Sequence, residues 1–218
     1  MMKATYRTPD AFFVSPTGRR MQRQIKAVLE NEKLRGKTTA FIGEIFPFLN
    51  AFEQDPPDIV SETRDFEEND LSDFLFTPQS LDVFFLSVLN PSVADSFPRL
   101  IKSAFFALKP EGRAFVLIKN SRLFNLLDDC RMPETKSSAI IGRFSENGFS
   151  PFLKKGILRL PYSPAAFDKA EDFLFSANIG SGCFSLLGGI KNPPVVEKIE
   201  NHGSTRMTSA SVFTSPRT

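Results

Sequence analysis

The hydrophobic pattern between residues 81 and 120 predicts a strand, a helix and a second strand. Leu81–Leu89 is an almost unbroken apolar run, typical of a strand that is covered on both faces. Apolar residues then recur at helical spacing up to Leu108, so one stripe of a helix should face the sheet. Ala114–Ile118 is a second buried strand. Two parallel strands joined by a helix need a right-handed crossover, and repetition of this unit predicts a doubly wound α/β sheet.

Capping and turn residues predict where this helix begins and ends. Asp95 or Ser96 can cap it, with Pro98 in the first turn, where no backbone donor is missed. Residues 109–112, Lys-Pro-Glu-Gly, should end the helix, with Gly112 free to adopt a positive φ.

The same patterns predict further elements on both sides of this unit. They are a helix from Pro16 capped by Ser15, strands at Thr38–Ile42 and Ile59–Val60, helices at Leu123–Leu127, Ser137–Glu146 and Ala165–Phe175, a hairpin of strands Phe149–Leu153 and Gly156–Leu160, and a final strand at Cys183–Ile190. Only about forty residues separate the first strand from the one at Leu81, so we expect an abbreviated second and third strand region.

The expected organisation is one domain with a lead and a tail. Residues 1–14 should be an irregular lead in which Ala11–Val14 can anchor on the body, and residues 15–197 should form the domain. Residues 198–218 are rich in Ser and Thr and lack an apolar pattern, which predicts a disordered tail.

Composition indicates a cytoplasmic protein with a core filled mainly by phenylalanine. The 218 residues include 24 Phe, no Trp and two Tyr. Cys130 and Cys183 are far apart and lack metal-ligand spacing, so we expect two free thiols in a reducing compartment. No apolar run approaches the ~20 residues that span a bilayer, and the N-terminus has no signal-peptide core.

Charge is distributed unevenly although the net charge is only +2. Residues 1–37 hold nine Lys and Arg against three acids, whereas residues 44–82 hold one Arg against eleven acids. A nucleic-acid surface needs positive charge clustered along one face, so the acidic half argues against nucleic acid as a partner. The pattern does not indicate an oligomeric state.

Gly43 follows a predicted strand, at the kind of junction where an α/β domain places a cofactor loop. A dinucleotide fingerprint needs three glycines and this loop has one, so an NAD-type site is not expected.

Three segments carry a family resemblance in their order and spacing. Phe105–Asn120, FFALKPEGRAFVLIKN, is similar to a helix that runs through "vLkPGGrl" into a strand, with Glu111 in place of the first glycine of the pair. The run 70–83 is similar to "D-A…LPF…sFDlV", and Glu146–Pro151 to an "eaGF" segment that opens the last strands. The pattern resembles class I S-adenosylmethionine-dependent methyltransferases of the broad type 11 group. The resemblance implies a mostly parallel, Rossmann-like methyltransferase sheet with helices on both faces.

The resemblance also implies a pocket for S-adenosyl-L-methionine along the carboxyl ends of the first strands. Gly43 and Glu44 would be what remains of the glycine loop under the methionine part. Glu62 stands where an acidic group holds the ribose hydroxyls. Asp70 and Leu71 would flank the adenine ring.

The same resemblance places the methyl acceptor beside the cofactor. Ser87 and Val88, at the end of the Leu81 strand, would line the floor between cofactor and acceptor. The loop Ser121–Lys136 would cover the acceptor side, where Arg122 and Arg131 could favour an anionic substrate.

The sequence gives no candidate for acid–base, nucleophilic or metal chemistry. His202 is the only histidine and lies in the expected tail, so no Ser/His/Asp or Cys/His arrangement is available. No metal-ligand cluster is present in the sequence. Methyl transfer needs little of this equipment, because the sulfonium is already activated and positioning does most of the work. The catalytic residues therefore stay unassigned.

Two functions stay open at this stage. The first is an S-adenosylmethionine-dependent methyltransferase with an unknown acceptor. The second is an inactive methyltransferase fold that has lost cofactor binding and serves as a binding or scaffolding protein. Bulky Ile45 and Phe46 stand where the family has glycines, and Glu44 adds negative charge near the cofactor's carboxylate. A different nucleotide-binding Rossmann protein is disfavoured by the missing glycines.

Overall fold

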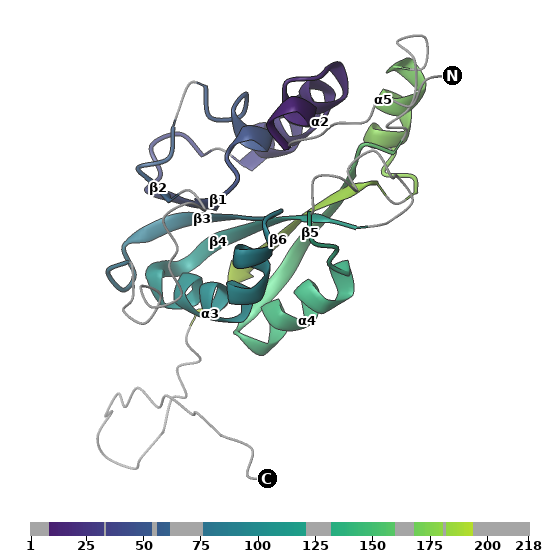
Figure 1. The fold of residues 1–218 in the computed structure, drawn as a ribbon. Coiled ribbons are helices and arrows are strands. Elements are labelled where there is room, and N and C mark those ends of the chain that lie inside the picture. Colours follow the sequence, from purple (N-terminus) through teal and green to yellow (C-terminus); the bar gives the residue numbers. More distant parts are fainter. Residues whose placement is uncertain are drawn as a thin grey trace, which may run out of the picture.

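A six-stranded sheet lies between two layers of helices in the computed structural model (Figure 1). The structure describes residues 9–32, 34–53, 56–61, 76–120, 132–159, 168–180 and 182–193. Among these residues, none of the helices has the length and hydropathy that crossing a bilayer requires.

The sheet is mostly parallel, with one reversed strand. Its order is β2-β1-β3-β4-β6-β5. Strands β2, β1, β3 and β4 run parallel, and β6 is antiparallel to both of its neighbours. The strands are β1 (Thr39–Gly43), β2 (Ile59–Ser61), β3 (Leu81–Val88), β4 (Leu108–Lys119), β5 (Phe149–Ile157) and β6 (Phe184–Lys191). This confirms the predicted doubly wound α/β class.

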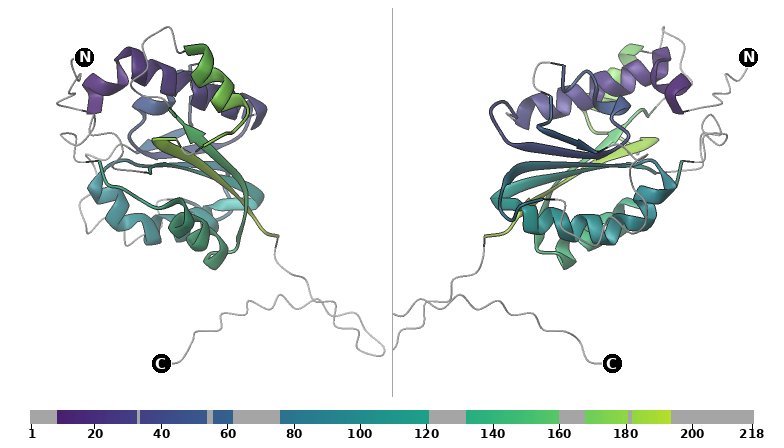
Figure 2. Two further views of the ribbon diagram at one scale, coloured as in Figure 1. Left: turned by 90° about the vertical axis from the view of Figure 1, so that its right-hand side faces the viewer. Right: turned by 60° about the vertical axis from the view of Figure 1, so that its left-hand side comes forward.

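The helices divide between the two faces of the sheet, as two further views show (Figure 2). One face carries α1 (Pro9–Phe13), α2 (Pro16–Leu29) with the short η1 (Glu30–Glu32), η2 (Phe46–Phe48) and α5 (Asp168–Ser176). The other carries α3 (Pro91–Ala107) and α4 (Ser137–Glu146). Each layer of helices packs on a separate apolar cluster of the sheet.

Alternate side chains of β3 point to opposite faces of the sheet and belong to different apolar clusters. Val83 and Phe85 belong to the cluster under α2, whereas Phe84 and Leu86 belong to the cluster under α3. This two-sided burial is why the strand reads as an unbroken apolar run. Phenylalanine is the main filler, as expected: the Phe85 ring lies 5.2 Å from the Phe115 ring on β4.

Helix α3 begins earlier than predicted. Asn90 caps it, because its side-chain oxygen accepts a hydrogen bond from the Ser92 N–H at 2.9 Å. Pro91 therefore occupies the first turn, and Pro98 lies inside the helix. From sequence, Pro91 and Pro98 could each stand in a first turn after an acceptable cap, and the folded chain uses the earlier start at Asn90.

Strand β4 starts at Leu108, six residues before the predicted Ala114. Residues 109–112 continue the strand through a register shift against β3 instead of forming a separate turn. The prediction placed a positive φ at Gly112, but the residue that adopts one is Glu111, with φ 63°. Gly112 is required by a close approach, since a Cβ there would lie 2.8 Å from the carbonyl oxygen three residues earlier.

Strand β5 is continuous, so the predicted hairpin of Phe149–Leu153 and Gly156–Leu160 is wrong. Residues 154–156, expected to form its turn, pair with β6 along the edge of the sheet. Lysine side chains are common on such edge strands, where one side faces water. Gly156 serves packing rather than a turn, because a Cβ there would lie 2.8 Å from a backbone nitrogen of a neighbouring segment.

The N-terminal segment is more ordered than expected. Pro9–Phe13 is a helix within the lead that was predicted to be irregular. Phe12 and Phe13 are buried in the core, which confirms that this segment anchors on the body. The Ser15 cap is confirmed as well, since its hydroxyl accepts a hydrogen bond from the Gly18 N–H at 3.1 Å.

Other predictions have mixed outcomes. Helix Ser137–Glu146 has the predicted bounds, and β2 is as short as expected. The predicted helix Leu123–Leu127 and the tail over residues 198–218 lie outside the described residues. The domain boundaries stay predictions.

A buried polar network joins α5 to α2 and to the end of β5. The Glu171 carboxylate is fully buried and accepts hydrogen bonds from Gln24 Nε2 and from the Arg159 backbone N–H, both at 2.9 Å. Gln24 in turn accepts from the Leu158 N–H at 2.9 Å. Buried charge is tolerated only with such partners, so this network fixes where α5 docks.

We expect Glu171→Ala to destabilise the fold by roughly 2–4 kcal/mol, because it leaves buried donors on Gln24 and Arg159 without an acceptor. Urea unfolding measures the change. The matched control is Asp172→Ala at the exposed neighbouring position, which should stay within about 0.5 kcal/mol of wild type. Equal effects of the two variants would contradict the role of the network.

Asp82 ties the start of β3 to two neighbouring segments. Its carboxylate accepts from Lys109 Nζ and from the Thr38 N–H, each at 2.9 Å. Partial burial raises the pKa of Asp82, but these hydrogen bonds and nearby lysine charges together outweigh burial and hold the pKa below its usual value.

A depressed carboxyl pKa stabilises the fold above the unfolded-state pKa and loses this effect as the pH falls through the folded-state pKa. Asp82→Asn should therefore lower the free energy of unfolding by about 1 kcal/mol at pH 7 and by less near pH 3. The expected loss at pH 7 is small because the Lys109 side chain is well exposed. Urea titrations at both pH values measure this. A cost that does not depend on pH would show that charge is not the cause.

Candidate functional site at the carboxyl edge of the sheet

Polar residues gather where the parallel strands end. β1, β3 and β4 run in one direction, so Gly43, Ser87 and Asn120 lie toward the same edge of the sheet. In open α/β sheets ligands bind outside the carboxyl ends of the strands, where the strand order reverses. Here that reversal falls between β1 and β3.

Gly43 and Ser87 are register partners at this edge. Gly43 has φ +102°, and a Cβ at that position would lie 2.5 Å from the Ser87 carbonyl oxygen. The position therefore requires glycine. The Ser87 hydroxyl is completely buried and has no hydrogen-bond partner among the described residues. Buried hydroxyls are rarely left unpaired, which marks this atom as a candidate ligand-binding group.

The segment after β1 is apolar rather than glycine-rich. Ile45 and Phe46 pack against the core cluster under α2, and the Phe46 ring is stacked on the Phe13 ring with 6.3 Å between centroids. Glu44 is half-buried between Gly43 and this segment. Phe46 is the first residue of the short helix η2.

The structure brings together only part of the predicted cofactor pocket. Gly43, Glu44 and Ser87 lie at one edge, whereas Glu62, Asp70 and Leu71 lie outside the described residues. The ribose and adenine roles of those three residues stay predictions.

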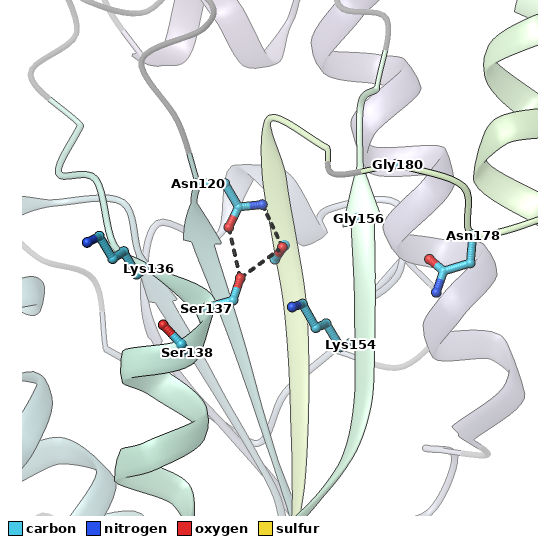
Figure 3. Close-up of a pocket in the computed structure, with 9 residues that line it drawn as sticks. Asn120, Lys136, Ser137, Ser138, Lys154, Gly156, Asn178 and Gly180 are labelled. Carbon is cyan, nitrogen blue, oxygen red and sulfur yellow. Dashed lines mark hydrogen bonds between the residues drawn. The ribbon is translucent and has the colours of Figure 1, made fainter.

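A cavity of about 360 Å³ lies at the same edge, over β4, β5 and β6 (Figure 3). All of its lining residues are polar or glycine: Asn120, Lys136, Ser137, Ser138, Lys154, Gly156, Asn178, Gly180 and Ser185. They come from the end of β4, the start of α4, the end of β5, the segment after α5 and the start of β6.

Asn120 holds the wall of this pocket together. Its amide donates to Ser185 Oγ at 2.6 Å and to the Gly182 carbonyl at 3.0 Å. Its side-chain oxygen accepts from Ser137 Oγ at 3.0 Å (Figure 3). Three elements that are distant in sequence are thereby fixed around one cavity.

Sequence reasoning missed most of this pocket. Of its lining, only Lys136 lies in the loop Ser121–Lys136 that was expected to cover the acceptor side; Arg122 and Arg131 lie outside the described residues. One signal was available, because Asn120 is a polar residue that comes shortly after an apolar strand. Lys154 could not be found in this way, since it was assigned to a turn.

The described residues at this edge of the sheet offer neither a reactive cysteine nor a metal site. Cys183 is a free, buried cysteine, and burial, with a smaller contribution from Glu171, raises the pKa of its thiol. A buried, protonated thiol is a poor nucleophile. The described residues hold no cluster of potential metal ligands. His202 and Cys130 lie outside them.

The comparisons with known proteins bear on the fold. No protein-family model matches the chain, and no curated protein matches its sequence. Solved structures do match. A SAM-dependent methyltransferase from Thermotoga maritima, described as a possible histamine N-methyltransferase, has a TM-score of 0.54 at 13% identity over 84% of this chain and 94% of its own.

Two further structures show the range of this fold. The 1,6-didemethyltoxoflavin-N1-methyltransferase of Burkholderia thailandensis, solved with S-adenosylhomocysteine, has a TM-score of 0.51 at 11% identity over 84% of this chain and 82% of its own. The cyclase SpnF has a TM-score of 0.50 at 13% identity over 78% and 80%. The chain therefore has the class I methyltransferase fold. At these identities the likeness shows the fold and not the reaction.

Gly43→Ala should destabilise the protein by on the order of 2–4 kcal/mol, through the left-handed φ and the contact with the Ser87 carbonyl. The control is Gly142→Ala inside α4, where nothing lies within 4 Å of the added Cβ. Gly142→Ala should stabilise the folded protein by about 0.5–1 kcal/mol. Thermal unfolding compares them, and a tolerated Gly43→Ala would show that the two strands can separate.

Proposed function

We propose that the chain is an S-adenosylmethionine-dependent methyltransferase that acts in the cytoplasm. The observation that carries the proposal is the buried, unpartnered Ser87 hydroxyl beside Gly43, at the reversal point of a methyltransferase-type sheet. The fold supports the class of protein, and this atom supports a ligand at the expected place. The methyl acceptor is unidentified.

The chain's own contribution to such a reaction would be orientation. When bound, S-adenosylmethionine supplies an activated methyl group, so the protein has to align the two reactants and exclude water. Gly43 leaves the strand end without a side chain, and Ser87 offers one hydroxyl for a hydrogen bond. Glu62 would hold the ribose, and Asp70 and Leu71 would flank the adenine.

The acceptor would lie next to this position, over β4. Ser87 pairs with Leu117 on β4, and Asn120 lies three residues later, just past the end of that strand. At ~3.3 Å per residue this puts the polar pocket roughly 10 Å from Ser87. A small molecule held in the pocket could reach that far.

Calorimetric titration with S-adenosylmethionine and S-adenosylhomocysteine tests the proposal. We expect saturable binding of both in the micromolar range. Ser87→Ala should weaken binding roughly five- to tenfold through the loss of one hydrogen bond. The melting temperature of this variant should not fall, because the hydroxyl that it removes has no partner among the described residues.

Ser145→Ala serves as the control, since this serine lies on the exposed face of α4 and bonds only within its helix. It should leave both affinities unchanged. No binding of either ligand at millimolar concentration would overturn the methyltransferase proposal and support the noncatalytic alternative. Unchanged affinity in Ser87→Ala would remove Ser87 from the site.

A further inference from the structure

We propose that the polar pocket around Asn120 binds an anionic group, a carboxylate or a phosphate, on the methyl acceptor. The assignment to an acceptor rests on the proposed function. The anion site itself rests on the charge and the hydrogen-bond donors of the pocket.

The charge of the pocket is entirely positive. Lys136 and Lys154 line it from two different elements, and no carboxylate is among its lining residues. Neither lysine forms an ion pair within the described part of the chain. Glu134, the nearest acid in sequence to Lys136, is paired with Lys119 at 3.7 Å. The Lys154 ammonium points toward Ser137, whereas that of Lys136 points away from the centre of the pocket (Figure 3). An ammonium group without a carboxylate partner favours an anion beside it.

Backbone donors point the same way. Helix α4 begins at Ser137, and its first intrahelical bond is donated by the Ala139 N–H to the Lys136 carbonyl. The amides of Ser137 and Ser138 precede that bond, and no side chain caps this end of the helix. Both residues line the pocket. Free amides at a helix N-terminus stabilise negative charge.

A buried hydroxyl also lies in the wall of the pocket. Ser185 is only 3% exposed, and its oxygen already accepts from Asn120 Nδ2 at 2.6 Å. Ser137 directs its single hydroxyl hydrogen to Asn120 at 3.0 Å, leaving only a long 3.4 Å contact between the two serine oxygens. Within the network the Ser185 hydrogen has only this long contact with Ser137 Oγ, so it can be donated to a closer acceptor in the pocket.

Asn178 adds donors from the opposite wall. Its side-chain oxygen accepts from Arg159 Nη2 at 2.9 Å, which fixes the orientation of the amide and leaves its two N–H groups. Arg159 is itself held by the Gly156 carbonyl at 2.7 Å. The pocket therefore combines fixed N–H and O–H donors with two cations and has no apolar side chain. Drug-like ligands prefer largely apolar pockets, so this one suits a compact anionic group.

Amide chemical-shift titrations of the full chain test the site, with sodium phosphate and sodium acetate as probes and sodium chloride at equal ionic strength as reference. We expect phosphate or acetate, but not chloride, to shift the signals of Ser137 and Ser138 saturably. The stronger of the two probes identifies the group. Lys136→Gln with Lys154→Gln should weaken binding roughly five- to tenfold. Lys102→Gln, an exposed lysine of α3, is the control and should have no effect.

Titration of the same variants with S-adenosylhomocysteine separates this inference from the proposed function. Unchanged cofactor affinity with lost anion binding supports both proposals. Cofactor binding in a protein whose amides respond equally to chloride overturns the anion site alone. Anion binding without any cofactor binding leaves the anion site and overturns the assignment to a methyl acceptor.

Discussion

The whole arrangement depends on burying both faces of the central parallel strands. β1, β3 and β4 make their backbone hydrogen bonds to one another, so their side chains must find apolar cover above and below. Phenylalanine supplies most of that cover, from Phe41 and Phe85 on one face to Phe84 on the other. Because both faces are closed by helices, a polar site can form only at an edge of the sheet.

That edge has two parts with different character. Beside the strand reversal, Gly43 and Ser87 come into close contact, and the neighbouring Ile45 and Phe46 are absorbed into the core. Over β4 and β6, polar side chains surround an open cavity. S-adenosylmethionine has a sulfonium centre and a large adenosine part. A compact anionic group differs from it in size and charge, so the two need different binding sites. The proposed cofactor site and the proposed anion site therefore involve different side chains.

Much of the fold followed from sequence, and less of the site did. Long apolar runs such as Leu81–Leu89 and Ala114–Ile118 were found because two-sided burial leaves a pattern in consecutive residues. Boundaries were harder: Asn90 and Ser96 are both acceptable caps, and only packing chooses between them. Lys154 was placed in a turn because Lys-Lys-Gly is typical of turns, whereas its pairing with β6 depends on residues some thirty positions away.

The sequence by itself determined the α/β class, the order of the main elements, Gly43 and Ser87 as candidates, and phenylalanine as core filler. These properties are local, because residues that are close in sequence determine periodicity, helix caps and strand ends. Only the tertiary structure decided that Gly43 faces the Ser87 carbonyl, that the Ser87 hydroxyl is left unpaired, and that two lysines share one pocket. Those facts depend on strand register and on the docking of α4, which join residues far apart in the chain.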